Sequence, residues 1–246
     1  MNTSIKKILA LDSTAEVSTV AVCQGERLLS EITVNTGNTH SETLLPAVEQ
    51  ALKMAEITVN DIDLFACSTG PGSFTGVRIG VATVKGIAYG KNKPCASVST
   101  LEALAYNLSG YNGIICPVMN ARRSQVYNAL FECENGKLAR LCPDRAIAIS
   151  ELDGELANIE KPIYLCGDGY SITENGLKAA KPEYVPVRQR YQSAYSVAQI
   201  ALAKYESDET VSDTELVPIY LRPSQAERER QAKIDAEKNS EVNKNE

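Results

Sequence analysis

The chain has 246 residues, a formal net charge of −6 and 43% hydrophobic residues. That length allows one large domain or two modest ones, and the hydrophobic share can supply a packed core, which excludes wholesale disorder. The acidic balance argues against a free-standing nucleic-acid binder, and the single histidine argues against a catalytic zinc site, which usually needs two or three imidazoles.

The seven cysteines are scattered and show no C-x-x-C spacing, so neither a zinc ribbon nor a redox pair is predicted. Their odd number and apolar neighbours indicate buried free thiols, which are typical of a reducing compartment. The apolar stretch that follows Lys7 stops at Asp12 and is too short for a signal peptide, and no run approaches the roughly 20 residues of a membrane span. We therefore expect a cytoplasmic protein that does not contact a membrane.

The first hundred residues predict the order strand, strand, strand, helix, strand, helix. Runs rich in β-branched residues alternate with turn signals such as Gln24-Gly25-Glu26, and apolar residues later recur at helical spacing. In chain order we expect strands at 5–12, 17–24 and 27–34, a helix at 40–56, a strand at 62–68 and a helix at about 74–90.

The remainder partly repeats this order, which predicts a second, smaller lobe. We expect a helix at 99–109, strands at 113–119, 125–133 and 137–141, a helix at 150–157, a strand at 162–166 and helices at 170–180 and 192–206. The predicted division is a first lobe at 1–100, a second lobe at 101–223 and a tail at 224–246. The tail carries 11 charges in 23 residues and is expected to be helical or disordered.

The glycine-rich stretch from Ser68 to Gly80 lies between a predicted strand and the start of a helix, an arrangement that can bind anions. It matches neither a Walker loop nor a dinucleotide fingerprint, because Val77 follows Gly76 where a P-loop has Lys. A tight structural turn whose helix is capped by Ser73 or Thr75 is the alternative.

Small residues recur along the following helix at three- and four-residue steps. An interior glycine costs about 0.8–1.0 kcal/mol relative to alanine, so several in one helix need a reason. That reason is close backbone approach, either to the helix's own domain or to a partner subunit. The residues concerned are Gly76, Gly80, Thr83, Gly86 and Gly90.

Three loops are candidates for phosphate or carboxylate binding. Asp12-Ser13-Thr14 ends the first strand, where actin-like and sugar-kinase-like ATPases place an acid, although a strand-end Asp is also a common turn residue. Gly167-Asp168-Gly169 is its counterpart in the second half or a simple turn. Arg122-Arg123 can hold an anion or form a solvated hairpin tip. His40 alone cannot hold a metal.

These motifs, taken in order, resemble the bacterial TsaB (YeaZ) family. The glycine block is the specific match, and Asn120 departs from the family's usual Asp. The matching stretches are Ile8–Thr14, His40–Pro46, Gly70–Gly80, Asn120–Arg123 and Pro218–Pro223.

The resemblance implies an α/β fold of the actin/hexokinase/Hsp70 type, with two duplicated β-β-β-α-β-α lobes. It implies a non-catalytic partner in forming N6-threonylcarbamoyladenosine at position 37 of tRNA, which binds and activates the TsaD transferase together with the ATPase TsaE. The chain would form a homodimer when alone and reach tRNA only through the complex. No catalytic or metal-binding residue is implied, and ATP or ADP would lie at the complex interface.

Carried onto this sequence, the partner-binding helices are 40–56 and 74–90. The interface residues are Leu44, Leu45, Val48, Gly72, Ser73, Phe74, Thr75, Gly76, Arg78, Gly80 and Thr83, and the nucleotide-phosphate residues are Asp12, Ser13 and Thr14. On this interpretation Gly80→Leu breaks pairing with TsaD and leaves the monomer folded. An actin-fold ATPase or small-molecule kinase that uses Asp12 is the alternative function, and the lack of histidines argues against a metalloprotease.

Overall fold

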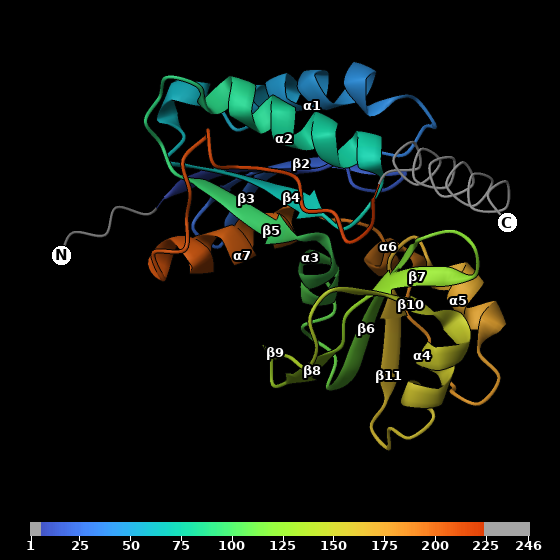
Figure 1. Ribbon diagram of the computed structural model, residues 1–246. Coiled ribbons are helices and arrows are strands. Elements are labelled where there is room, and N and C mark those ends of the chain that lie inside the picture. The colour runs from blue at the N-terminus through green and yellow to red at the C-terminus, as the bar shows by residue number, and fades with distance from the viewer. Residues whose placement is uncertain (1–5, 224–246) are drawn as a thin grey trace, which may run out of the picture.

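The computed structural model describes residues 6–223, and the first of its two lobes is a five-stranded sheet (Figure 1). The strands lie in the order β3-β2-β1-β4-β5, with β2 antiparallel to both neighbours and β1, β4 and β5 parallel. Residues of β1 and β4 are buried on both faces, as expected at the centre of a sheet that helices cover on both sides. The strands are β1 (Lys7–Asp12), β2 (Ser18–Gln24), β3 (Arg27–Val34), β4 (Leu64–Gly70) and β5 (Cys95–Ser99).

Helices α1 (His40–Met54) and α2 (Phe74–Ala88) lie side by side on one face of this sheet. Their apolar stripes, which include Leu44 and Val81, pack on β1, β2 and β4. Helix α7 (Ala194–Glu206) covers the opposite face. The lobe is therefore a three-layer α/β/α arrangement.

The second lobe is built around β6, which pairs with β7 and β8 on one side and runs parallel to β11 on the other. Helices α4 and α5 cover one face of its six-stranded sheet. The elements are β6 (Gly113–Asn120), β7 (Gln125–Asn128), β8 (Phe131–Glu134), β9 (Lys137–Arg140), β10 (Arg145–Ala148), α4 (Ile149–Leu156), β11 (Ile163–Cys166), α5 (Tyr170–Gly176) and α6 (Val187–Arg190).

The two lobes repeat one topology. In each, a first strand is followed by an antiparallel hairpin, a helix, a strand parallel to the first and a second helix. The second lobe differs because β7 and β8 together occupy the place of β2, while β9 and β10 together occupy that of β3. The predicted duplicated fold is confirmed, and the strands of the second copy are more fragmented than those of the first.

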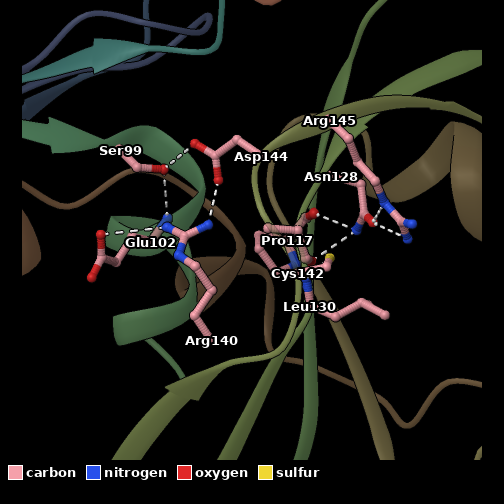
Figure 2. Close-up of polar contacts among 10 residues, drawn as sticks. Ser99, Glu102, Pro117, Asn128, Leu130, Arg140, Cys142, Asp144 and Arg145 are labelled. Carbon is pink, nitrogen blue, oxygen red and sulfur yellow. Dashed lines mark hydrogen bonds and ion pairs between the residues drawn. The ribbon is translucent and has the colours of Figure 1, made fainter.

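Helix α3 (Thr100–Tyr106) joins the lobes and packs on both. Ser99 caps it by accepting a hydrogen bond from the backbone N–H of Glu102, and also donates its hydroxyl proton to Asp144 of the second lobe. Arg140 on β9 pairs with both Asp144 and Glu102, so one polar cluster ties the start of α3 to the second sheet (Figure 2).

A second cluster in Figure 2 ties the strands of this lobe together. The Asn128 amide nitrogen donates to the carbonyl of Pro117, and its oxygen accepts from Arg145. These bonds join β6, β7 and β10 inside the lobe, so the buried Asn128 has partners for both ends of its amide.

Several element predictions need correction. Strands β5 and β10 and helix α6 were not predicted, and the strand expected at 125–133 is two strands, β7 and β8. The helix expected at 170–180 ends at Gly176, where a side chain would clash with Ile149 of the neighbouring helix. Short strands that pair with distant segments leave little local pattern to predict from.

The C-terminal part of the described chain returns to the first lobe. Helix α7 packs on the first sheet, and Leu216 is buried in the core beneath α1 and α2, although the predicted division placed 101–223 in the second lobe. The physical reason is that the first sheet needs a covering layer on both faces, and α7 covers the face opposite α1 and α2. The predicted tail at 224–246 lies outside the described residues.

Candidate functional site at the cleft between the lobes

The turn after β1 is held by the carboxylate of Asp12. Its Oδ1 accepts from the backbone N–H of Thr14 at 2.8 Å and from the Thr14 hydroxyl at 2.7 Å. Complete burial raises the pKa of Asp12, and the Ser68 hydroxyl and the two Thr14 donors offset part of that rise. The Ser68 contact lacks hydrogen-bond geometry, so Oδ2 has no partner within residues 6–223.

The glycine block packs directly on this turn. The backbone N–H of Ser73 donates to the carbonyl of Thr14 at 2.7 Å, and the Ser13 hydroxyl donates to the carbonyl of Gly76 at 2.8 Å. A side chain on Gly72 or Gly76 would clash with the carbonyl oxygens of Thr14 and Ser13. The glycines therefore allow α2 to begin in backbone contact with the turn after β1.

Ser73 caps α2, as one of the two sequence alternatives predicted. Its hydroxyl oxygen accepts from the backbone N–H of Gly76 at 3.3 Å. This bond satisfies one of the free N–H groups at the start of the helix, which an anion would otherwise use. The geometry thus favours the structural interpretation of the turn.

His40, the first residue of α1, uses its side chain for a hydrogen bond to the backbone. Its Nε2 lies 2.6 Å from the carbonyl oxygen of Ala15, so this nitrogen carries the proton and donates it. The bond joins the start of α1 to the hairpin between β1 and β2. Within residues 6–223 no group of three or more His, Cys, Asp and Glu side chains is placed to hold a metal ion.

The turn after β1 and the glycine block form one wall of a cleft of about 500 Å³ between the lobes. The opposite wall comes from the β6–β7 turn and from the loop after β11. The lining residues are Thr14, Ala15, Glu16, Gly72, Ser73, Phe74, Thr75, Met119, Asn120, Ala121, Arg122, Tyr127, Asp168, Arg222 and Pro223. The structure therefore brings together the Asp12 turn, the glycine block, the arginine loop and the loop at Asp168.

The far wall carries charge of both signs. Arg122 and Arg123 are exposed at the tip between β6 and β7, with positive φ angles of 63° and 55°. The Asn120 side chain accepts a hydrogen bond from the backbone N–H of Arg122 at 2.8 Å, so the side chain that holds this turn is an uncharged amide. Burial raises the pKa of Asp168 to about 6, with the charges of Glu16 and Asp12 adding to the effect.

The predicted interface residues fall into two groups. Leu44, Val48, Gly76 and Gly80 face the interior of the first lobe, so they form no part of its surface. A Cβ on Gly80 would lie 2.7 Å from the Ser13 hydroxyl inside the lobe, so Gly80→Leu is expected to disturb the packing of the monomer itself and is a poor test of pairing alone. Leu45, Ser73, Thr75 and Arg78 are exposed, and Gly72, Phe74 and Thr83 are partly exposed.

The C-terminal segment adds residues that were not singled out as site residues. Tyr220 stacks on Phe74 with ring centroids 4.0 Å apart, and its hydroxyl accepts from Arg78 Nε at 2.8 Å. Arg222 then donates to the carbonyl of Ala121 across the cleft. The motif at 218–223 marks this segment in the sequence, but its contacts join residues more than 100 positions apart.

Comparisons with known proteins agree with this architecture. Residues 28–228 match the family model described as "TsaD: tRNA N6-adenosine threonylcarbamoyltransferase". A Bacillus subtilis protein named "tRNA threonylcarbamoyladenosine biosynthesis protein TsaB" is 30% identical over 220 residues, which cover 89% of this chain and 96% of that protein. The Escherichia coli protein of the same name is 28% identical and covers 88% and 94%.

Among solved structures, YeaZ from Pseudomonas aeruginosa has the same fold. Its TM-score is 0.75 at 22% identity, and the match covers 88% of this chain and all of that one. Inside the described part of this chain, no helix is both long and apolar enough to cross a bilayer. The glycine block, the duplicated lobes and these relatives together show that the chain belongs to the TsaB (YeaZ) family.

Proposed function

We propose that this chain is a non-catalytic partner subunit in the formation of N6-threonylcarbamoyladenosine on tRNA. It binds and activates a TsaD-type transferase, and a TsaE-type ATPase joins the complex. The curated relatives that span nearly their whole length are named as biosynthesis proteins for this nucleoside, which supports the assignment.

The single observation that carries the partner role is the outer face of α1 and α2. Leu45 is 58% exposed, Met54 is 62% exposed, and Tyr89, the residue after α2, is 79% exposed. Exposed large apolar side chains, here spread along two adjacent helices, are typical of a protein-protein contact surface. The same face would pair two copies of the chain when the transferase is absent.

Small residues on α2 complete this face. Ala82 and Gly86 are exposed and lie four residues apart on one side of the helix, and nothing within 4 Å surrounds a Cβ built on Gly86. A partner helix can approach closely over such a ridge. The interface predicted at Gly76 and Gly80 is thus replaced by these outward-facing positions.

Co-purification with the transferase tests this surface. We expect Leu45→Glu and Gly86→Glu to abolish capture of the TsaD-type protein while neither variant lowers the unfolding midpoint. Leu141→Glu is the matched control, because Leu141 is 50% exposed on the second lobe, away from both helices. Full capture by both helix variants would contradict the proposed surface.

The structure weighs against the alternative, an ATPase that uses Asp12. The Thr14 N–H, the Ser73 N–H and the Gly76 N–H are all bonded within the protein, so the turn has few donors left for phosphate. We propose that any ATP or ADP lies at the interface with the partners. Sustained ATP turnover by the isolated chain, abolished by Asp12→Asn, would favour the ATPase instead.

A further inference from the structure

A small hollow lies beside the cleft, between the hairpin after β1 and the segment that leads into α7. Its volume is about 190 Å³. At about 30 Å³ for each water, the space fits roughly six waters or one small organic molecule. Its walls include Glu16, Asp168, Tyr170, Arg190 and Gln192.

Gln192 is the unusual residue of this hollow. It is only 4% exposed, yet neither its amide nitrogen nor its amide oxygen has a hydrogen-bond partner in the described chain. A buried amide without partners is destabilising, and native structures rarely keep one without a reason. Asp168 Oδ1 in the same hollow is also buried and unpartnered within residues 6–223.

The charged walls of the hollow do not neutralise each other. Arg190 is fixed by its Nε, which donates to the carbonyl of Val185 at 2.7 Å, and by its guanidinium, 3.5 Å from the centre of the Tyr170 ring. Among the described residues it forms no ion pair with Asp168 or Glu16. The fixed guanidinium of Arg190 and the carboxylates of Asp168 and Glu16 therefore line the same hollow without forming an ion pair.

We propose that this hollow binds a small zwitterionic amino acid, whose carboxylate meets Arg190 and whose ammonium group meets Asp168 and Glu16. The Gln192 amide accepts from the ammonium group and donates to a carboxylate or hydroxyl oxygen. A purely anionic ligand would face two carboxylates, and a purely cationic one would face Arg190. The site is independent of the partner role proposed above.

Calorimetric titration of the full chain tests the proposal with five probes. Glycine, L-serine and L-threonine carry both charges, whereas ethanolamine carries only the ammonium group and propionate only the carboxylate. We expect at least one amino acid to bind at millimolar concentrations or below, and each singly charged probe to bind at least about tenfold more weakly. Gln192→Met should weaken binding at least about tenfold.

A stability measurement separates the ligand site from an ordinary buried glutamine. In the free protein Gln192→Met should keep or raise the unfolding midpoint, because no protein bond to the amide is lost. Gln199→Met is the matched control: Gln199 is 7% exposed and donates to the carbonyl of Gly25, so its loss should lower the midpoint and leave binding unchanged.

Three results would overturn the proposal. The first is the absence of binding by all three amino acids. The second is equal binding of a singly charged probe. The third is a Gln192→Met variant that destabilises the free protein as much as Gln199→Met, because ordered water would then be satisfying the amide.

Discussion

Two aspartates of the second lobe occupy opposite environments. Asp153 accepts hydrogen bonds from the backbone N–H groups of Lys178, Ala179 and Ala180, at 2.9–3.2 Å. These bonds, led by that from Ala180, lower the pKa of Asp153. At Asp168 burial outweighs the backbone N–H groups of Asn120 and of Asp168 itself, and raises the pKa to about 6. Local donors therefore decide whether a carboxylate stabilises or strains this lobe.

Asp153→Asn should reduce stability in a pH-dependent way. Because the folded pKa of Asp153 is lowered, its contribution is present above the unfolded pKa of about 3.9 and is lost as pH falls through the folded value. Urea unfolding at pH 7 should show a clear loss in the variant, and the difference from wild type should shrink below about pH 4. A difference that stays constant over this range would contradict the assigned role.

Asp168→Asn should have the opposite effect. Its folded pKa of about 6 lies above the unfolded value, so the ionised carboxylate costs stability at higher pH and the cost disappears as pH falls towards about 4. Two pKa units correspond to roughly 3 kcal/mol, so we expect the variant to be more stable at pH 8 by up to about that amount. Equal stability of the two proteins at pH 8 would contradict this environment.

At the scale of elements, the small residues of α2 and of the loop that leads into it serve two different purposes. Gly72, Gly76 and Gly80 face the turn after β1, where a side chain would clash, whereas Gly86 faces open space. The repeating pattern in the sequence does not distinguish these cases, because both helix faces carry small residues. Only the position of the neighbouring turn assigns each glycine its role.

Paired alanine substitutions test this division. Gly76→Ala should lower the free energy of unfolding by about 3 kcal/mol or more, because its Cβ would clash with a backbone carbonyl that cannot move away alone. Gly86→Ala should raise it by about 0.8–1.0 kcal/mol, the difference in helix propensity. Denaturant titrations of the two variants give both values, and similar effects at the two positions would disprove the division.

The sequence predicted those elements whose pattern is local. Strand β3 and the start of α2 match their expected positions, because β-branched runs and helical spacing extend over whole elements. Strand β5 was missed because Cys95–Ser99 is a short run that is stabilised by pairing with β4, about thirty residues away. Gly86 was recognised as one of the small residues of this helix but was not placed among the interface residues, because which side of a helix is buried depends on its tertiary neighbours.

At the scale of the whole molecule, the cleft assembles segments from five distant parts of the chain, the last of them at Arg222 and Pro223. The motifs at Asp12, Gly72, Arg122 and Asp168 were each identified from the sequence, but their meeting in one cleft is a property of the duplicated fold. Gln192 itself had no sequence signal, since a polar residue at the start of the helix predicted at 192–206 is ordinarily exposed. On the proposed function the first lobe contacts a partner through α1 and α2, while residues at the N-terminal end of α2 line the cleft.

The central claim is that this chain supports threonylcarbamoyladenosine formation through the outer face of α1 and α2. Mass spectrometry of tRNA nucleosides, after depletion of the chain and re-expression of wild type, Gly86→Glu or Leu141→Glu, tests it most directly. We expect the modified nucleoside to disappear on depletion and to return with wild type and Leu141→Glu but not with Gly86→Glu. Persistence of the nucleoside after depletion would contradict the assigned function, and full rescue by Gly86→Glu would contradict the assigned surface.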